Sequence, residues 1–340
     1  MKILISSQYF YPSLGGSETN AEILAREFLK QGHEIKLTTQ TPGTPNDLHG
    51  KPFPFEVIRQ PQVRQLIALT RWCNVCLQNG VILRQLWALW LTQTPWVIRH
   101  QTWVRQPHKN ATLLIQLKLL AVKLATSISI SKAIAQHLHH PSTIIPNPYR
   151  DDQFRLTPEV QREKDLVYVG RLVSDKGVDL LLQAVADLKA FDLIPKLTVI
   201  GSGKEEHALR HQSIDLGIDA QVTFVGSKTG DELVTLLNQH HILVIPSRWY
   251  EPFGVVALEG IACGCVVVGS SEGGLKDAIG DCGITFPNGD EVALTDNLRR
   301  LLTQPDLLAR YRTHASSHLA KHRQAVVAKA YLQVLQSACQ

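Results

Sequence analysis

A short apolar run that leads through a loop into a helical stretch recurs along the whole chain. The chain opens with KILISS at residues 2–7, passes through Gly15 and Gly16, and has a helical pattern from 17 to 31 before the next apolar run, EIKLTT. Strand, helix and strand in this order build a parallel sheet, because parallel neighbours need a crossover connection. Further helices are predicted at 81–92 and 111–125. The first half of the chain is therefore predicted to be α/β.

The second half repeats the same pattern. DLVYVG at 165–170 is followed by KLTVIG, VTFVG, ILVIP and CVVVG, each ahead of a loop and a helix, whereas IPNP at 145–148 interrupts any regular element. We predict two Rossmann-like, doubly wound domains at 1–150 and 151–322. A C-terminal helix at 323–340 is free to pack on either domain, including back on the first. Since open parallel sheets bind ligands at the carboxyl ends of their strands, we expect the two domains to face an interdomain cleft.

Composition places the chain among globular proteins, with 44% hydrophobic and 19% charged residues. No apolar run has the length of a bilayer span or the layout of a signal peptide, which favours a cytoplasmic location. Six cysteines in 340 residues do not form a disulfide framework. We expect these thiols to be buried and reduced.

The net charge of +5 is unevenly distributed, because residues 57–150 contain no Asp or Glu. Such a segment attracts anions. Nucleic acid is disfavoured, since no helix-turn-helix, zinc-finger or RNP-like motif is present. An anionic membrane is a better candidate than nucleic acid, because tryptophans lie between the basic residues of this segment and indole rings favour bilayer interfaces. For any single tryptophan, packing in the core is the favoured explanation. The basic residues of this segment are Arg59, Arg64, Arg71, Arg84, Arg99, Arg105, Lys109, Lys118, Lys123, Lys132 and Arg150.

Three motifs place candidate ligand-binding residues after predicted strands. Gly15 and Gly16 remove side chains where a backbone approaches a ligand, at the start of a helix. In VGRLVSDKGVD, Arg171 and Lys176 are suited to bind a diphosphate. The segment alone is equally compatible with the two residues being solvated loop charges. His100 ends the run WVIRH, but it is one of fourteen histidines and a lone histidine is usually structural.

The stretch SRWYEPFGVVALEGIACG at 247–264 is the most specific of the motifs in the chain. A helix is predicted to begin near Gly254, so that the N–H groups of Gly254 and Val255 and the positive dipole end face an anion. Glu251 lies in the preceding loop, and Glu259 lies on the helix among apolar neighbours, where an unused carboxylate would be costly to bury. We expect Glu259 to accept hydrogen bonds from sugar or ribose hydroxyls.

Together these motifs resemble the retaining glycosyltransferase family numbered four, which has the GT-B fold. The GG loop, the strand-end histidine, SKAIAQHL leading to IPN, VGRLVSDKG, the E-x7-E form EPFGVVALE and SEGGLKDAIGDCG occur in the family's order. The chain departs from the family at Pro148, where glycine is common, and at Lys276, which replaces the proline of GG-x-PE.

The resemblance implies a role for each candidate residue. Arg171 and Lys176 would hold the donor diphosphate, and Glu259 the ribose. Glu251 would bind the hydroxyls of the transferred sugar, and His100 would lie beside that sugar. The implied catalytic set is His100, Arg171, Lys176 and Glu251, and the donor-binding set adds Gly15, Gly16, Phe253, Gly254, Val255 and Glu259 to the last three.

The implied activity is retaining, metal-independent transfer of a sugar from a UDP- or GDP-hexose type donor to a sugar, lipid-linked or small-molecule acceptor. The nucleotide sugar is a co-substrate, and neither a cofactor nor a metal ion is expected, since the chain has no D-x-D motif. Cell-surface polysaccharide or glycolipid synthesis at the inner face of the membrane is the expected setting. Two alternatives remain: a nucleotide-sugar 2-epimerase of the same fold, and a non-catalytic scaffold, which the presence of Arg171, Lys176 and Glu259 disfavours.

Overall fold

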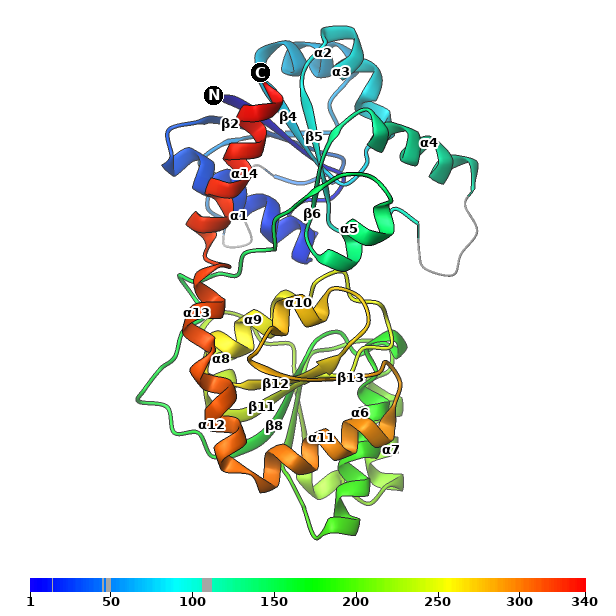
Figure 1. Ribbon diagram of the computed structural model, residues 1–340, viewed down its shortest axis with the longest axis vertical. Helices are drawn as coiled ribbons and strands as arrows, with labels where there is room; N and C mark the ends of the chain where they lie inside the picture. The colour runs from blue at the N-terminus through cyan, green and yellow to red at the C-terminus, as the bar shows by residue number, and fades with distance from the viewer. Residues whose placement is uncertain (14, 45, 47–49, 106–111) are drawn as a thin grey trace. The chain divides into compact units, whose positions relative to one another are not determined.

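The computed structural model describes residues 1–13, 15–44, 46, 50–105 and 112–340, so Lys109 of the basic segment lies outside the described residues. The chain divides into two compact units (Figure 1). Unit 1 comprises Met1–Pro148 and Gln324–Gln340, and unit 2 comprises Tyr149–Arg323. The predicted boundaries, after residues 150 and 322, differ from these by two residues and one residue. The C-terminal segment belongs to unit 1.

Unit 1 is built on a parallel sheet, for which the described residues give seven strands in the order β3-β2-β1-β4-β5-β6-β7. The order reverses between β1 and β4, which pair directly from Ile3↔Val75 to Ser7↔Asn79. Such a reversal is the topological switch point at which open sheets bind ligands. The strands are β1 (Lys2–Ser7), β2 (Glu34–Thr39), β3 (Glu56–Arg59), β4 (Val75–Asn79), β5 (Trp96–His100), β6 (Thr126–Ser129) and β7 (Thr143–Ile144).

Helices cover both faces of this sheet. Successive side chains of β1 point to opposite faces, so that both faces carry apolar side chains that must be buried. Ile3 and Ile5 pack in the core cluster that α1 and α14 complete, whereas Leu4 packs in the cluster on the other face. The predicted helix over 81–92 is instead a 3₁₀ turn, η1 (Leu83–Gln85), followed by α3. The helices are α1 (Gly16–Lys30), α2 (Val63–Trp72), α3 (Leu86–Thr92), α4 (Leu113–Lys123), α5 (Lys132–Leu138) and α14 (Gln324–Ala338).

Unit 2 has a second parallel sheet in the order β10-β9-β8-β11-β12-β13, with its switch point between β8 and β11. Ile242, Leu243 and Val244 in β11 are all fully buried. A strand covered on both faces reads as a continuous apolar run, which is why ILVIP was recognisable in the sequence. The strands are β8 (Lys164–Val169), β9 (Leu197–Ile200), β10 (Val222–Gly226), β11 (His240–Ile245), β12 (Val266–Ser270) and β13 (Gly283–Phe286).

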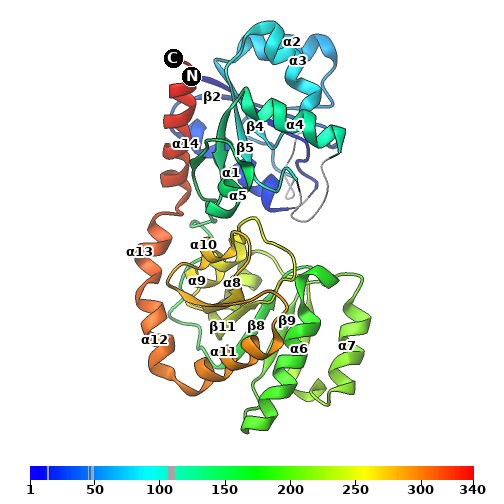
Figure 2. The same ribbon diagram turned by 45° about the vertical axis from the view of Figure 1, so that its right-hand side comes forward.

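The helices of unit 2 alternate with its strands, and α6 and α7 lie side by side (Figure 2). Leucines of α6 and α11 join the strands in one core cluster. The helices are α6 (Val178–Asp187), α7 (Glu206–Asp215), α8 (Gly230–Gln239), α9 (Val255–Ala262), α10 (Leu275–Ile279), α11 (Glu291–Thr303), α12 (Pro305–Thr313) and α13 (Ala315–Ala320), with 3₁₀ turns η2 (Ser174–Lys176), η3 (Leu188–Phe191) and η4 (Asp219–Gln221).

Two further expectations can be compared with the structure. In the part of the chain that is described, no helix combines the length and apolar character needed to cross a bilayer. All six cysteines are free thiols, and five are buried as expected. The exception is Cys339, which is exposed beyond the end of α14. The expectation of burial was wrong for this residue, whose thiol contacts the Leu335 and Asn74 carbonyls but stays exposed.

Candidate active site

The two loops at the switch point of unit 2 are held against each other by their backbones. A β-carbon at Gly177, where φ is +69°, would lie 2.0 Å from the Pro246 carbonyl oxygen, so only glycine fits. The N–H groups of Arg248 and Trp249 donate to the Asp175 carbonyl at 3.0 and 3.1 Å. The motifs VGRLVSDKG and SRWYEPFG, separated in sequence, therefore form one site at the carboxyl ends of β8 and β11.

Lys176 and Glu251 form the centre of this site. Lys176 Nζ donates to Glu251 Oε1 at 2.5 Å, and Ser247 Oγ donates to the same oxygen at 2.7 Å. The two charged side chains are 20% and 13% exposed, so the pair is largely shielded from water. The sequence predicted contacts to different parts of a donor, and the structure pairs the two residues with each other. Ser247, four residues before Glu251 in the quoted stretch, was missed.

Arg171 supplies a cation that nothing in the described part of the chain neutralises. It directly follows β8 and Gly170, and its side chain is exposed. Among the described residues no hydrogen bond or ion pair involves its guanidinium, while its backbone carbonyl accepts from Tyr168 Oη at 2.9 Å. The carbonyl contact fixes the backbone and leaves the guanidinium available to an anion.

The N-terminus of α9 also faces this region. Gly254 precedes the helix with φ of +93°, and no side chain caps the first N–H groups, including that of Val255. A β-carbon at Gly254 would lie 2.5 Å from Leu275 Cδ1. The position therefore needs glycine, because of this close contact and because φ is positive. The predicted donor contact of Phe253 stays a prediction; its ring is 2% exposed and lies 5.8 Å from the His322 ring. Only the backbone of Phe253 remains for a ligand.

A third loop, after β12, supports the Glu251 segment. The Gly274 N–H donates to the Glu251 carbonyl at 2.7 Å, and a β-carbon at Gly273, where φ is +87°, would lie 2.5 Å from that carbonyl oxygen. Lys276, which departs from the family pattern, lies within α10 two residues later. The close backbone approach of the glycine pair is therefore compatible with lysine at this position.

Glu259 lies on the second turn of α9 and is half-buried. Burial raises the pKa of its carboxyl group to about 7, against the lowering effect of the nearby Arg150 guanidinium. Within the described residues no side chain or backbone group hydrogen-bonds to this carboxylate. A desolvated carboxylate without a protein donor is suited to accept ligand hydroxyls. Arg150 appeared in the sequence only as a member of the basic segment.

The glycine pair lies at the switch point of unit 1. Gly15 is the extended N-cap of α1, and a β-carbon at Gly16 would have no neighbour within 4 Å, so the backbone there is open. Glu18 Oε2, however, would lie 2.8 Å from a β-carbon at Gly15. Because this buried carboxylate opposes anion binding, the α1 terminus is a weaker phosphate site than the α9 terminus. Sequence reasoning missed Glu18.

His100 is enclosed in the structure, and its expected place beside a sugar stays a prediction. It is 1% exposed at the end of β5, with Nε2 3.1 Å from Ser127 Oγ. Burial and the nearby His140 lower its pKa to about 4, which keeps the imidazole neutral. Its Nδ1 is buried and has no hydrogen-bond partner among the described residues.

Arg99, the residue before His100, was counted only among basic residues, yet it is also 1% exposed. Its Nη2 donates to Asn147 Oδ1 at 2.6 Å, and its guanidinium lies 5.5 Å from the centre of the Tyr331 ring. Asn147 is the asparagine of IPN, and Tyr331 is on α14. A buried arginine thus joins both segments of unit 1 that continue into unit 2.

Comparison with known proteins adds to this geometry. Residues 150–318, about half of the chain, match the family model described as glycosyl transferases group 1. An uncharacterized glycosyltransferase of Methanocaldococcus jannaschii is 41% identical over 117 residues, 34% of this chain and 30% of that protein. The D-inositol 3-phosphate glycosyltransferase of Stackebrandtia nassauensis is 34% identical over 167 residues, 46% of this chain and 38% of that protein. The chain thus matches about a third of the length of these relatives.

The likeness to solved structures extends over both units. HepE of Anabaena, solved in complex with UDP, aligns with a TM-score of 0.86 and 18% identity over 99% of this chain and 100% of HepE. At this identity the likeness shows the fold alone, which is that of the GT-B glycosyltransferases. The chain therefore has the GT-B fold and carries, at residues 150–318, a domain of the glycosyl transferases group 1 family.

Proposed function

We propose that the chain is a retaining glycosyltransferase that moves a sugar from a nucleotide-diphosphate sugar of UDP- or GDP-hexose type to a sugar, lipid-linked or small-molecule acceptor. One observation carries the proposal: Lys176, Glu251 and the uncapped N-terminus of α9 converge at the switch point of unit 2. The names of similar proteins support it, since HepE was solved with UDP and with UDP-glucose, and the S. nassauensis relative is a D-inositol 3-phosphate glycosyltransferase.

The chemistry of the leaving group matches these residues. The bond between the anomeric carbon and the diphosphate oxygen breaks, a bond to the acceptor oxygen forms, and the acceptor proton passes to the departing diphosphate. The negative charge that grows on the diphosphate must be stabilised. Arg171, Lys176 and the first N–H groups of α9 would provide this stabilisation, so the reaction needs no metal ion. The same-face attack that gives retention rests on the family resemblance.

Glu251 and Glu259 would position the donor around the diphosphate. When the diphosphate takes over part of the Lys176 ammonium, Glu251 Oε1 is free to accept from a sugar hydroxyl, with Ser247 still holding its orientation. Glu259, one helical turn after the N-terminus of α9, would accept from the ribose. Phe253 would contribute through its backbone, and His100 would act on the acceptor side only indirectly, because its ring is enclosed.

A donor screen tests the proposal. The chain is incubated with UDP- and GDP-hexoses, with and without candidate acceptors, and release of the nucleoside diphosphate is followed in the presence of EDTA. Release that depends on an acceptor and survives EDTA is expected. Conversion of UDP-N-acetylglucosamine to its 2-epimer without an acceptor would instead favour the epimerase. Activity that EDTA abolishes and magnesium or manganese restores would overturn the metal-independent leaving-group site.

We further propose that unit 1 docks reversibly on an anionic membrane, as a lipid-linked acceptor in polysaccharide or glycolipid synthesis requires. Helix α4 and the residue after it expose leucines to an unusual extent, between 47% and 73%, next to the lysines of the same helix. Trp90 on α3 is 65% exposed as well. An apolar surface flanked by cations, in a segment without carboxylates, suits an anionic lipid surface. The leucines are Leu113, Leu114, Leu117, Leu120 and Leu124.

A further inference from the structure

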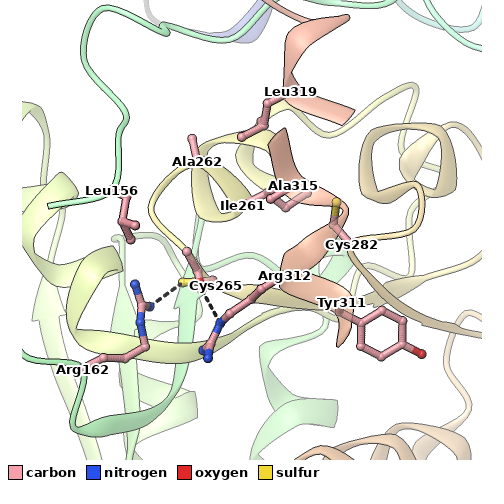
Figure 3. A pocket seen from close by; sticks show the side chains of 11 residues that line it. Leu156, Arg162, Ile261, Ala262, Cys265, Cys282, Tyr311, Arg312, Ala315 and Leu319 are labelled. Atoms are coloured by element: carbon pink, nitrogen blue, oxygen red, sulfur yellow. Dashed lines mark hydrogen bonds between the residues drawn. The ribbon is translucent and has the colours of Figure 1, made fainter. Parts of the chain in front are cut away.

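A cavity of about 320 Å³ lies in unit 2 at the end of α9 opposite the candidate active site (Figure 3). Ile261 and Ala262 of the last turn of α9 line it, as does Cys265, which directly precedes β12. Further lining residues come from α12, from α13 and from the segment before β8. The cavity is therefore at the amino ends of the strands, whereas the candidate active site is at their carboxyl ends. A volume of this size is within the range of small-molecule sites.

Two guanidinium groups give the cavity a positive wall. Figure 3 shows Arg162 and Arg312 on either side of Cys265. Arg162 Nη2 donates to the Cys263 carbonyl at 2.6 Å, and Arg312 Nε donates to the Gly264 carbonyl at 2.9 Å. These contacts satisfy carbonyl groups just after α9, but carbonyl groups do not neutralise the positive charges.

No carboxylate of the described residues compensates the two charges. Among the residues that the structure describes, neither Arg162 nor Arg312 forms an ion pair. The pKa of Arg312 is lowered, first by burial and second by the positive charge of Arg162. Two partly buried cations that repel each other beside an open volume are relieved by an anion in that volume.

The remaining lining determines what kind of anion fits. The thiol groups of Cys265 and Cys282 are buried, and burial raises the pKa of each to about 11, so both stay neutral. A bare inorganic ion would leave the apolar wall in contact with water, whereas an organic anion would cover it. The apolar side chains are Leu156, Ile261, Ala262, Ala315 and Leu319.

We propose that this cavity binds a small organic anion with an apolar body, whose carboxylate or phosphate lies between Arg162 and Arg312. The apolar body lies against the side chains of α9 and α13. The site is independent of the proposed transferase activity, because none of its residues belongs to the donor-binding set.

Isothermal titration calorimetry of the full chain with octanoate tests the site, with octanol and inorganic phosphate as matched probes that lack the charge and the apolar body. Octanoate is expected to bind at one site, at least tenfold more tightly than either control probe. R312Q, whose amide can still donate to the Gly264 carbonyl, should weaken octanoate binding about tenfold, the loss of one charge-assisted contact. A315L, which fills the cavity without changing charge, should weaken it at least as much.

The control variant is R300Q, which removes an exposed arginine of α11 and should bind octanoate like the parent chain. Circular dichroism establishes that each variant is folded before it is titrated. Absence of saturable octanoate binding at millimolar concentration overturns the proposal. So does equal binding of octanol or phosphate, or octanoate binding that both R312Q and A315L leave unchanged, which would place the ligand elsewhere, as on the leucines of α4.

Discussion

Lys176 Nζ lies 2.5 Å from Glu251 Oε1, which joins the loops after β8 and β11 through opposite charges. Neither side chain is fully exposed, and Ser247 donates to the same carboxylate oxygen. Removing one partner of a shielded pair leaves the other charge uncompensated. The stability lost in this way is larger than the net contribution of the pair to stability. The pair is thus expected to organise the site before a donor binds.

A double-mutant cycle measures this coupling. K176M and E251Q should each destabilise the fold by about 1–3 kcal/mol, since each leaves an uncompensated polar partner. The double variant should lose less than the sum of the two losses, with an interaction energy of about 0.5–3 kcal/mol. Urea unfolding of the four proteins gives these values. Strictly additive losses would contradict the coupling.

Arg171 and Lys176 should act together on the donor. R171A/K176A is expected to lower turnover roughly 10²- to 10⁴-fold, because two charge-assisted contacts to the diphosphate are lost. R171A alone should leave the free energy of unfolding nearly unchanged, since its guanidinium forms no hydrogen bond or ion pair among the described residues. R300A is the matched control for removing an exposed arginine. Near-normal turnover of the double variant would eliminate the diphosphate contact.

Glu259 should make the stability of the chain depend on pH. Its pKa is about 7 in the folded chain against 4.5 for the unfolded reference, so the folded state binds more protons between these values. The contribution of Glu259 to stability is therefore present below pH 4.5 and is lost as the pH rises through 7. Urea unfolding of the parent chain and of E259Q across this range measures the difference. If the difference in the free energy of unfolding between the parent chain and E259Q did not change with pH, the raised pKa would be contradicted.

His100 should titrate in the opposite sense. Its folded pKa of about 4 lies below the reference value of 6.5, so the unfolded state binds the proton first as the pH falls. The stability that the neutral ring contributes is present above pH 6.5 and is lost as the pH falls toward 4. NMR titration of the imidazole should show no protonation between pH 8 and pH 5. Titration of His100 near 6.5 would show that the ring is accessible.

The strands and helices could be predicted because a buried element leaves a pattern of apolar residues in its own stretch of sequence. Apolar runs such as 242–244 are covered on both sheet faces, and the helix after Gly254 begins one residue later, at Val255. The 3₁₀ turn at the start of the expected helix at 81–92 could not be predicted; it ends at Gln85, whose buried side chain accepts from Ser6 across 79 residues, a contact that local sequence does not show.

The composition of the candidate site was easier to predict than its internal contacts. Sequence position indicated that Lys176, Glu251 and Glu259 follow strands, since the carboxyl ends of parallel strands share one edge. It could not show that Lys176 bonds to Glu251, because that distance depends on strand order. Nor could it show that Arg99 and His100 are buried, because charged and polar residues are usually exposed and only packing against β6 and α14 encloses these two.

The exposed leucines of α4 should govern membrane binding. The parent chain is expected to sediment with phosphatidylglycerol vesicles and much less with phosphatidylcholine vesicles, and added salt should weaken binding because it screens the lysines. L117Q/L120Q should reduce binding by tenfold or more, since each leucine that enters the interface contributes about 1.5–3 kcal/mol. I194Q/I214Q, which replaces two exposed isoleucines of unit 2, is the matched control and should bind like the parent. Equal sedimentation with both lipids, or no effect of L117Q/L120Q, would favour a soluble acceptor.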